Sequence, residues 1–507
     1  MRSLSAPALL ATVDGEVVRV ASPATVLQAC EAAGAGVVAL CAHDSVSSAG
    51  TCGSCQVIAN GMVVRACREP LRADAVINTR GKAAVVARRQ ALAQVAAKHP
   101  SACSVCHQSG ACGLQDALAR SAPVPSPAIT LNALPAGTHS DALGDEVVLH
   151  KELCVGCTRC TSFANHVLKV PLLSLQAEPG HAPVLVVNEE EKLNAPYALA
   201  FTELCPTGVF TAKRVPQTQR WTTQATPSVC PRCATGCPVW LHHDHGQLRR
   251  VSSRGGAHFL CDEGYRLPLP PPWPRLSVPV AGGAVVSWDR ALDAASALLA
   301  PAMKAGTLGV VLSAQASTFD LCAISAFAIE RALATRTYVW AHNDGQPLPP
   351  LVSGDKSANR AAVAVLANRA VALEQLPIDL NAGTVTAVLV VGPIELAPPG
   401  FAALVQALQN APVLVVASVY EDPLVPIAKV AFPLAPFTET QGSFVNGAGH
   451  PQALRPVSAP QGDALPGWEL INHLARRLGV ELGFDNLTDV RGHLLRRHPS
   501  LIEESQT

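Results

Sequence analysis

The chain has 507 residues, which is too long for one hydrophobic core and typical of roughly three to five domains. Apolar residues make up 49% of it and charged residues 15%, a composition that excludes a disordered chain. The formal net charge is zero and no run rich in Lys or Arg occurs, so we expect no nucleic-acid partner.

The N-terminal residues lack the long apolar stretch and the cleavage site of a secretory leader. Apolar stretches such as 385–391 are far shorter than the ~20 residues that span a bilayer. We therefore expect a cytoplasmic chain without direct membrane insertion, whose membrane association comes through partners. Cysteines in that reducing compartment indicate metal ligands, because disulfides are rare there.

The first elements that the sequence predicts are a hairpin and a helix. Residues 11–20 alternate around Asp14-Gly15, which predicts a β-hairpin. Ser22-Pro23 then predicts a helix N-cap followed by a proline at the first helical position. A small β-rich domain fits this pattern, and the first candidate ligands follow at once.

Residues 82–98 predict a long helix that ends at His99-Pro100. A loose segment rich in Pro and Ala follows at 121–137, and a proline-rich joint occupies residues 266–279.

Beyond the joint, the sequence alternates between apolar strands and helices. Strands are predicted at 306–314, 386–392 and 411–420, and helices at 318–333 and 401–409. Continuous Val/Leu strands that alternate with helices indicate a parallel α/β domain.

All of the 17 cysteines except Cys30 and Cys322 fall, together with His99, into four sets of four spaced like iron–sulfur ligands. The sets are Cys41, Cys52, Cys55 and Cys67; His99, Cys103, Cys106 and Cys112; Cys154, Cys157, Cys160 and Cys205; and Cys230, Cys233, Cys237 and Cys261. Cys30 and Cys322 lie in apolar helical stretches and are interpreted as buried structural cysteines. Four redox centres in series indicate a conductor of electrons rather than a single-site catalyst.

Other metals remain alternatives for the first two sets. Zinc is an alternative for both, since one His and three Cys also form a common zinc site. Cys103 to His107 further matches the attachment pattern of c-type haem. Haem is disfavoured because no export signal is found and methionine ligands are scarce, so His107 is interpreted as a bystander.

The third set depends on a remote cysteine. Two-cluster ferredoxins place a fourth cysteine shortly after the third, but Ala164 stands at that position here. Cys205 therefore closes a single cluster with the triplet at 154–160.

The segment HPSACSVCHQSGACGLQD around the second set resembles the signature of the large iron–sulfur subunit, usually called the G subunit, of bacterial NADH-quinone oxidoreductase (complex I). The resemblance covers most of the chain. It implies a [2Fe-2S] cluster on the first set, a type also found in NAD-linked hydrogenases, and [4Fe-4S] clusters on the second and third. The fourth set resembles the N-terminal [4Fe-4S] site of molybdopterin oxidoreductases, and we expect it to be occupied.

The resemblance implies a multidomain α/β fold. Its parts are a β-rich [2Fe-2S] ferredoxin-like domain at 1–80, a helical His/Cys cluster segment at 81–120, a [4Fe-4S] ferredoxin-like domain at 121–220, a further [4Fe-4S] domain at 221–275, and a truncated molybdopterin-oxidoreductase-like α/β domain at 276–507. That last domain is expected to hold no molybdopterin, and Gly442 and Asn446 in it are interpreted as turn residues.

We find no nucleotide fingerprint, no P-loop and no catalytic residue in the sequence. The resemblance implies an electron relay from a flavin-bearing, NADH-oxidising partner toward quinone-reducing membrane partners, coupled in the complex to proton translocation. It places the chain at the cytoplasmic face of the inner membrane. Alternatives are the electron wire of an NAD-linked hydrogenase or formate dehydrogenase, and a zinc-rich scaffold without redox function.

Overall fold

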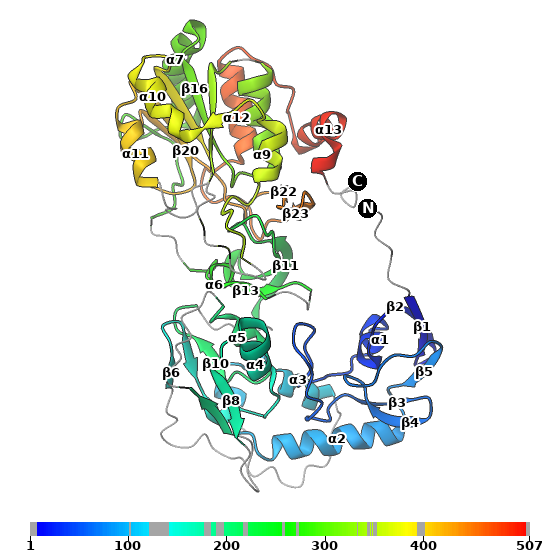
Figure 1. Ribbon diagram of the computed structural model, residues 1–507. Coiled ribbons are helices and arrows are strands. Elements are labelled where there is room, and N and C mark those ends of the chain that lie inside the picture. The colour runs from blue at the N-terminus through cyan, green and yellow to red at the C-terminus, as the bar shows by residue number, and fades with distance from the viewer. Residues whose placement is uncertain are drawn as a thin grey trace. The chain divides into compact units, whose positions relative to one another are not determined.

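The computed structural model describes residues 8–100, 103–120, 141–176, 184–188, 197–215, 222–255, 259–269, 273–331, 333–341, 345, 347, 352–392 and 401–502. The chain divides into two compact units (Figure 1). Unit 1 comprises Met1–Gln224 and Gly255–Arg266, and unit 2 comprises Ala225–Arg254 and Leu267–Thr507.

Unit 1 begins with a five-stranded sheet in the order β2-β1-β5-β3-β4. Its strands are β1 (Ala8–Val13), β2 (Glu16–Ala21), β3 (Gln56–Ala59), β4 (Met62–Arg65) and β5 (Ala75–Asn78). β1 and β2 pair antiparallel across Asp14 and Gly15, which both have positive φ. This is the hairpin that the alternation around Asp14-Gly15 predicts.

Helix α1 (Val26–Ala32) starts later than the sequence predicts. Thr25, not Ser22, is the N-cap: the Thr25 hydroxyl accepts from the Gln28 N–H, and the Gln28 side chain accepts from the Thr25 N–H. This reciprocal capping box satisfies two N–H groups at once, whereas a cap at Ser22 has no such partner in the helix.

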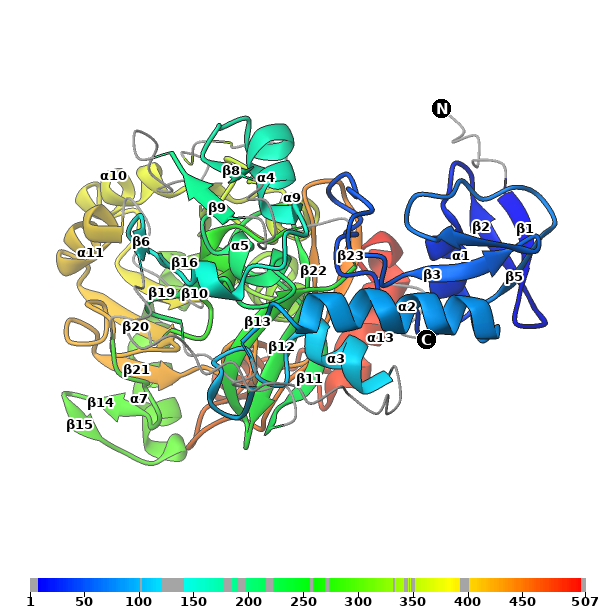
Figure 2. The same cartoon turned by 90° about the horizontal axis from the view of Figure 1, so that it is seen from below.

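The predicted helix at 82–98 is confirmed as α2 (Lys82–Ala96). It packs on β3 and is followed by the 3-10 turn η1 (Cys103–Val105) and by α3 (Gly113–Arg120), which packs on α2 (Figure 2). The loose segment predicted at 121–137 lies outside the described residues.

The rest of unit 1 surrounds the third ligand set. A three-stranded sheet has the order β10-β7-β6, and β8 pairs with β9. The elements are β6 (Asp141–Leu143), β7 (Val147–Leu149), η2 (Lys151–Leu153), α4 (Arg159–Ser162), η3 (Phe163–Leu168), β8 (Leu173–Gln176), β9 (Val184–Val187), α5 (Ala200–Leu204), β10 (Phe210–Ala212) and α6 (Asp262–Tyr265).

Unit 2 carries the antiparallel sheet β11-β12-β13 and an eight-stranded sheet. The smaller sheet comprises β11 (Gln224–Val229), β12 (Pro238–Asp244) and β13 (Gln247–Ser253). The larger comprises β14 (Val280–Ala281), β15 (Ala284–Val285), β16 (Leu308–Ser313), β17 (Arg336–Trp340), β18 (Val371–Ala372), β19 (Ala387–Val391), β20 (Val413–Ser418) and β21 (Val430–Pro433). The helices of unit 2 are α7 (Trp288–Ala305), α8 (Thr318–Ser325), η5 (Ala326–Glu330), α9 (Arg360–Leu366), η6 (Leu373–Gln375), α10 (Leu376–Asn381), α11 (Phe401–Gln409), α12 (Gly467–Arg477), α13 (Leu487–Arg497) and η7 (Pro499–Leu501).

The large sheet has the order β15-β14-β21-β20-β19-β16-β17-β18, and its six strands from β21 to β18 are parallel. This confirms the predicted parallel α/β domain, in the strand order of a doubly wound fold. The helix predicted at 318–333 is shorter than expected: α8 ends at Ser325 and continues as the π-helical η5.

The hairpin of β22 (Gly442–Val445) and β23 (Pro451–Leu454) corrects one prediction. Gly442 is a strand residue rather than a turn residue, and it pairs with Leu454. Asn446 does lie in the turn, where its side-chain oxygen accepts from the N–H groups of Ala448 and His450, both at 3.0 Å.

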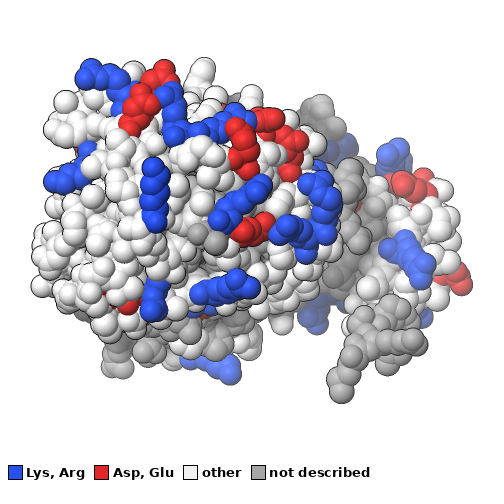
Figure 3. Space-filling view, turned by 90° about the horizontal axis from the view of Figure 1, so that it is seen from above, with Lys and Arg blue, Asp and Glu red and all other residues white. Residues whose placement is uncertain are grey.

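The face drawn in Figure 3 carries basic and acidic side chains interspersed among wide uncharged areas. Among the described residues, no helix is both long enough and apolar enough to cross a membrane.

Candidate metal centres

The first ligand set converges from two segments: Cys41, Cys52 and Cys55 lie between α1 and β3, and Cys67 lies just after β4. The sulfurs of Cys41 and Cys52 lie 3.2 Å apart, and the Ser48 hydroxyl lies 3.2 Å from the Cys67 sulfur. Hydrogen bonds from the thiols of Cys52 and Cys67 lower the pKa of Cys41, and a hydrogen bond links Cys55 with Cys67. The structure therefore brings these four sulfurs together.

Glycines and serines shape this first site. Gly50 and Gly53 have φ of 69° and 64°, a backbone region that glycine adopts without strain. The Ser54 hydroxyl lies 3.1 Å from the Cys52 sulfur and accepts from the Leu40 N–H at 3.0 Å. Ser48 and Ser54 are functional candidates that sequence reasoning missed, although their place between the ligands is a usable signal.

His99 is presented by the end of α2 in a state suited to ligation. Its Nδ1 lies 3.0 Å from the Pro100 carbonyl, which can only accept, so Nδ1 carries the proton. Its Nε2 is buried and has no hydrogen-bond partner among the described residues. Burial lowers the pKa of His99, which favours the neutral imidazole that a metal requires.

The other members of the second set lie in the turns before α3. Cys112 directly precedes α3 and is buried, whereas Cys103 in η1 is exposed and Cys106 is half-buried. Burial raises the pKa of the Cys106 and Cys112 thiols. A cluster overcomes this cost because its irons favour the thiolate form.

His107 is not predicted to be a ligand, and its contacts do not indicate a ligand role. Its Nε2 lies 2.8 Å from the Gly208 carbonyl, and its ring centroid lies 4.7 Å from that of His150. The haem alternative assigned this histidine to iron, but here it links two loops of unit 1.

The third set is buried as a group. Cys157, Cys160 and Cys205 are each less than a tenth exposed, and Cys154 is half-buried. Burial raises the pKa of Cys157 to about 12, with a further contribution from Cys205. The Gly156 N–H lies 3.5 Å from the sulfur of Cys154, and the Val209 N–H lies 3.4 Å from that of Cys205. Backbone donors to sulfur are one of the means by which proteins set cluster potentials.

Arg159 joins the first and third sets. Its guanidinium donates to the Ala39 carbonyl at 2.8 Å and to the Leu204 carbonyl at 3.3 Å. Ala39 stands two residues before Cys41, and Leu204 stands directly before Cys205. Sequence reasoning missed Arg159, because contacts with remote backbone carbonyls leave no spacing pattern.

Three members of the fourth set share one loop in unit 2. The Cys230 N–H donates to the Cys237 carbonyl at 2.9 Å, and the Gly236 N–H to the Cys233 carbonyl at 3.3 Å. Gly236 has φ of +63°, and a Cβ there would lie 2.3 Å from the Gln452 side chain, so this loop needs glycine. The fourth member, Cys261, belongs to unit 1.

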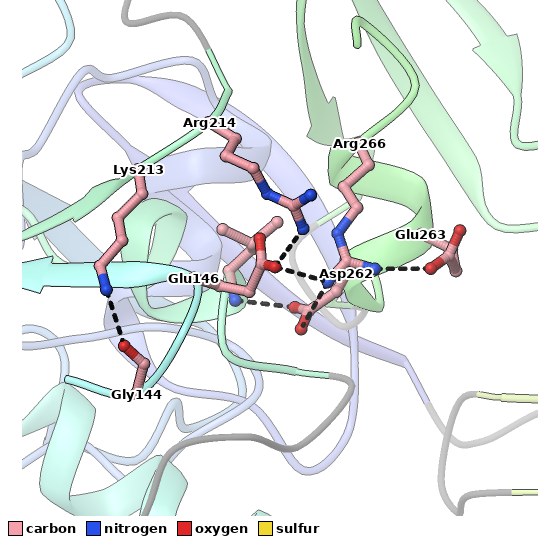
Figure 4. Close-up of polar contacts among 8 residues, drawn as sticks. Gly144, Glu146, Lys213, Arg214, Asp262, Glu263 and Arg266 are labelled. Carbon is pink, nitrogen blue, oxygen red and sulfur yellow. Dashed lines mark hydrogen bonds and ion pairs between the residues drawn. The ribbon is translucent and has the colours of Figure 1, made fainter. Parts of the chain in front are cut away.

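Cys261 is the N-cap of α6, and that helix is fixed by polar contacts within unit 1 (Figure 4). The Asp262 carboxylate accepts from the Leu199 N–H at 2.7 Å, and burial raises the pKa of Asp262 to about 6. Arg266 forms an ion pair with Glu146 at 3.2 Å, and Arg214 also pairs with Glu146.

The crevice where a doubly wound sheet binds nucleotides lies beyond the carboxyl ends of β16 and β19. Here the strands pack closely: a Cβ atom added to Gly392 would lie 2.3 Å from the Cβ atom of Ser313. The buried Asn359 side chain donates to the Ala316 carbonyl at 2.9 Å and accepts from the Val445 N–H at 2.8 Å. The contacts of Gly392 and Asn359 therefore leave little room at this point between the two strands.

The two remaining cysteines are buried, as predicted. Cys30 and Cys322 are at most 1% exposed, and burial raises the pKa of each to about 12. Among the described residues, no group of three or more His, Cys, Asp or Glu side chains is placed so that it could hold a metal ion.

Three family models match parts of the chain. The 2Fe-2S iron-sulfur cluster binding domain matches residues 7–82, and the ferredoxin-like domain of NADH-quinone oxidoreductase subunit 3 matches residues 144–211. The molybdopterin oxidoreductase model matches residues 354–477. These matches confirm the predicted mixed α/β, multidomain fold and support iron–sulfur binding.

Curated relatives of the chain include G subunits of NADH-quinone oxidoreductases. The relative from Pseudomonas fluorescens is 30% identical over 305 residues, which are 57% of this chain and 33% of the relative. Its counterpart in Escherichia coli (strain K12) is 27% identical over 267 residues, which are 50% of this chain and 29% of the relative. The chain thus matches about a third of the length of these relatives. The predicted resemblance to this large iron–sulfur subunit is confirmed.

A solved structure of an NAD+-reducing [NiFe]-hydrogenase in the H2-reduced state is similar to part of the chain. It shares 24% sequence identity and a TM-score of 0.36, and the match covers 41% of this chain and 89% of that chain.

Proposed function

We propose that this chain is an iron–sulfur electron-transfer subunit of an NADH-quinone oxidoreductase (complex I). The first ligand set holds one [2Fe-2S] cluster, and the second, third and fourth sets each hold one [4Fe-4S] cluster. When bound, these clusters supply one-electron transfer. The chain's own residues ligate them, exclude water from them and direct N–H groups at their sulfurs.

The observation that carries this proposal is the direct linkage of ligand loops within unit 1. The Gly113 N–H donates to the Pro206 carbonyl at 2.8 Å, next to Cys112 of the second set and Cys205 of the third. Arg159 links the loops of the first and third sets in the same way. Short contacts between successive centres are what a relay needs, whereas independent structural zinc sites have no need of them.

The α/β domain, proposed at 276–507, packs against partners and binds no molybdopterin. The close packing of Gly392 against Ser313 and the contacts of Asn359 beyond β16 support this assignment. The remaining boundaries, 1–80, 81–120, 121–220 and 221–275, belong to the same proposal. NADH oxidation takes place on a flavin-bearing partner and quinone reduction on membrane-associated partners at the cytoplasmic face of the inner membrane.

The test is anaerobic purification of the native assembly, followed by metal analysis and EPR after reduction. We expect about 14 iron atoms and as many sulfides per chain, one [2Fe-2S] signal and several [4Fe-4S] signals. Co-purification with a flavoprotein and membrane proteins supports complex I, whereas co-purification with a nickel-containing partner supports the hydrogenase alternative. A zinc-dominated, EPR-silent protein would overturn the proposal.

A further inference from the structure

A cavity of about 390 Å³ in unit 1 is lined by basic side chains. Its walls come from residues 35–38, from α2 and from α3, with Ser54 and Thr79 between them. Arginines line it at positions 80, 88, 89 and 120, and the described wall contains no carboxylate. This is an unusual concentration of positive charge in a chain whose formal net charge is zero.

Backbone carbonyls orient two of these guanidinium groups without neutralising them. Arg88 donates to the carbonyls of Gln56 at 2.6 Å and Thr79 at 2.7 Å, and Arg120 donates to that of Gly36 at 3.4 Å. Burial lowers the pKa of Arg88, the negative charge of Asp14 raises it, and the neighbouring positive charge of Arg89 lowers it. The cavity therefore holds like charges whose mutual repulsion an anion would relieve.

The carboxylate of Asp14, which contacts two of the lining residues, is already engaged. Asp14 accepts from the N–H of Thr79 at 2.7 Å and from its hydroxyl at 2.5 Å, and it pairs with Arg80 at 3.7 Å. Asp14 thus pairs with Arg80, and its negative charge also acts on Arg88.

We propose that this cavity binds a phosphate group. Guanidinium groups match the oxygens of phosphate with paired N–H donors. The volume lies near the lower end of the roughly 300–1,000 Å³ of ligand pockets, which suits a free phosphate or the phosphate of a small organic ester.

The site also reaches the first ligand set. Ser54 lines the cavity, and its hydroxyl lies 3.1 Å from the sulfur of Cys52. A bound dianion there stabilises the oxidised form of the adjacent centre and lowers its reduction potential. This coupling rests on the proposed function, whereas phosphate binding itself does not.

The binding test is calorimetric titration of the full chain at constant ionic strength, with inorganic phosphate in one arm and AMP in the other. The variant is Arg89→Gln/Arg120→Gln, and the control is Arg72→Gln, an exposed arginine outside the cavity. We expect one saturable site in the wild type and the control, weakened at least about tenfold in the double variant. Tighter binding of AMP assigns the site to an ester, and tighter binding of phosphate assigns it to the free ion. Absence of saturable binding, or equal binding by the double variant, refutes the site.

The coupling test is an EPR redox titration of the [2Fe-2S] signal with and without saturating phosphate. We expect phosphate to lower the potential in the wild type and to leave it unchanged in the double variant. Binding without a potential shift refutes the coupling alone. Absence of any [2Fe-2S] signal refutes the proposed function but leaves the calorimetric result standing.

Discussion

The backbone N–H of Gly113 donates a 2.8 Å hydrogen bond to the carbonyl of Pro206. Each residue directly follows a predicted ligand, Cys112 in one case and Cys205 in the other. One hydrogen bond and a few covalent bonds therefore separate ligands of the second and third sets, and the contact fixes the spacing of their loops.

This contact can be removed without removing a side chain. Gly113 is the first residue of α3, where proline is tolerated, so Gly113→Pro removes the N–H while adding a ring that the helix accepts at this position. We expect a loss of about 1 kcal/mol in the free energy of unfolding and slower electron transfer between the second and third centres. Rapid-freeze EPR measures the transfer.

Gly113→Ala is the matched control, since it keeps the N–H and its Cβ would meet no atom closer than 3.5 Å. Equal transfer rates in the Pro and Ala variants would contradict a role for the hydrogen bond.

Arg159 places a positive charge between the first and third sets. Replacement by Gln removes the charge, and we expect lower reduction potentials at both centres, because a nearby positive charge stabilises the more negative, reduced form of a cluster. Loss of its bonds to Ala39 and Leu204 should cost about 2 kcal/mol of stability. EPR redox titration is the measurement.

Arg159→Lys retains the charge and is expected to keep both potentials near those of the wild type. If the Gln variant titrates like the Lys variant, the charge of Arg159 does not set these potentials.

The proposal gives the second centre one neutral nitrogen ligand, that of His99. We expect His99→Cys to retain the cluster but to lower its potential, because a thiolate adds negative charge. His107→Asn is the control: His107 contacts the Gly208 carbonyl rather than a ligand position, so its [4Fe-4S] signal should persist. An unchanged titration in the Cys variant would exclude His99 as a ligand.

Stability of unit 2 should depend on pH through Asp422. Burial raises the pKa of this carboxyl, although the Ser418 hydroxyl and the Leu424 N–H donate to it at 2.6 and 2.8 Å. Since the folded pKa exceeds the unfolded value of about 3.9, the stabilising contribution is complete below that pH and is lost as the pH rises through the folded pKa.

Asp422→Asn keeps an acceptor but does not ionise. We therefore expect its stability relative to the wild type to increase as the pH rises above about 4. Urea unfolding from about pH 4 to about pH 7 measures the difference, and a constant difference would show that Asp422 titrates alike in the folded and unfolded chains.

Local patterns predict much of the fold. The Asp14-Gly15 turn and α2 depend on interactions within a few residues, and the sequence contains those interactions in full. The predicted N-cap of α1 is wrong because Thr25 competes with Ser22, and only the reciprocal contact with Gln28 decides between them. The prediction for Gly442 is wrong because its pairing with Leu454 depends on a strand that the sequence marks weakly.

The ligand sets are predicted from the sequence because clusters demand particular residue types, most of them at short spacing. The groups around them are not, since they act across long separations. Arg159 contacts a carbonyl 120 positions away in the chain, and only the folded backbone brings the two together.

Both edges of the eight-stranded sheet end in strands of two residues, β15 on one side and β18 on the other. Each edge offers little unpaired backbone to a second chain, which limits edge-to-edge pairing. A chain whose sheet is otherwise apolar and rich in Val is thereby protected from aggregating through its sheet edges.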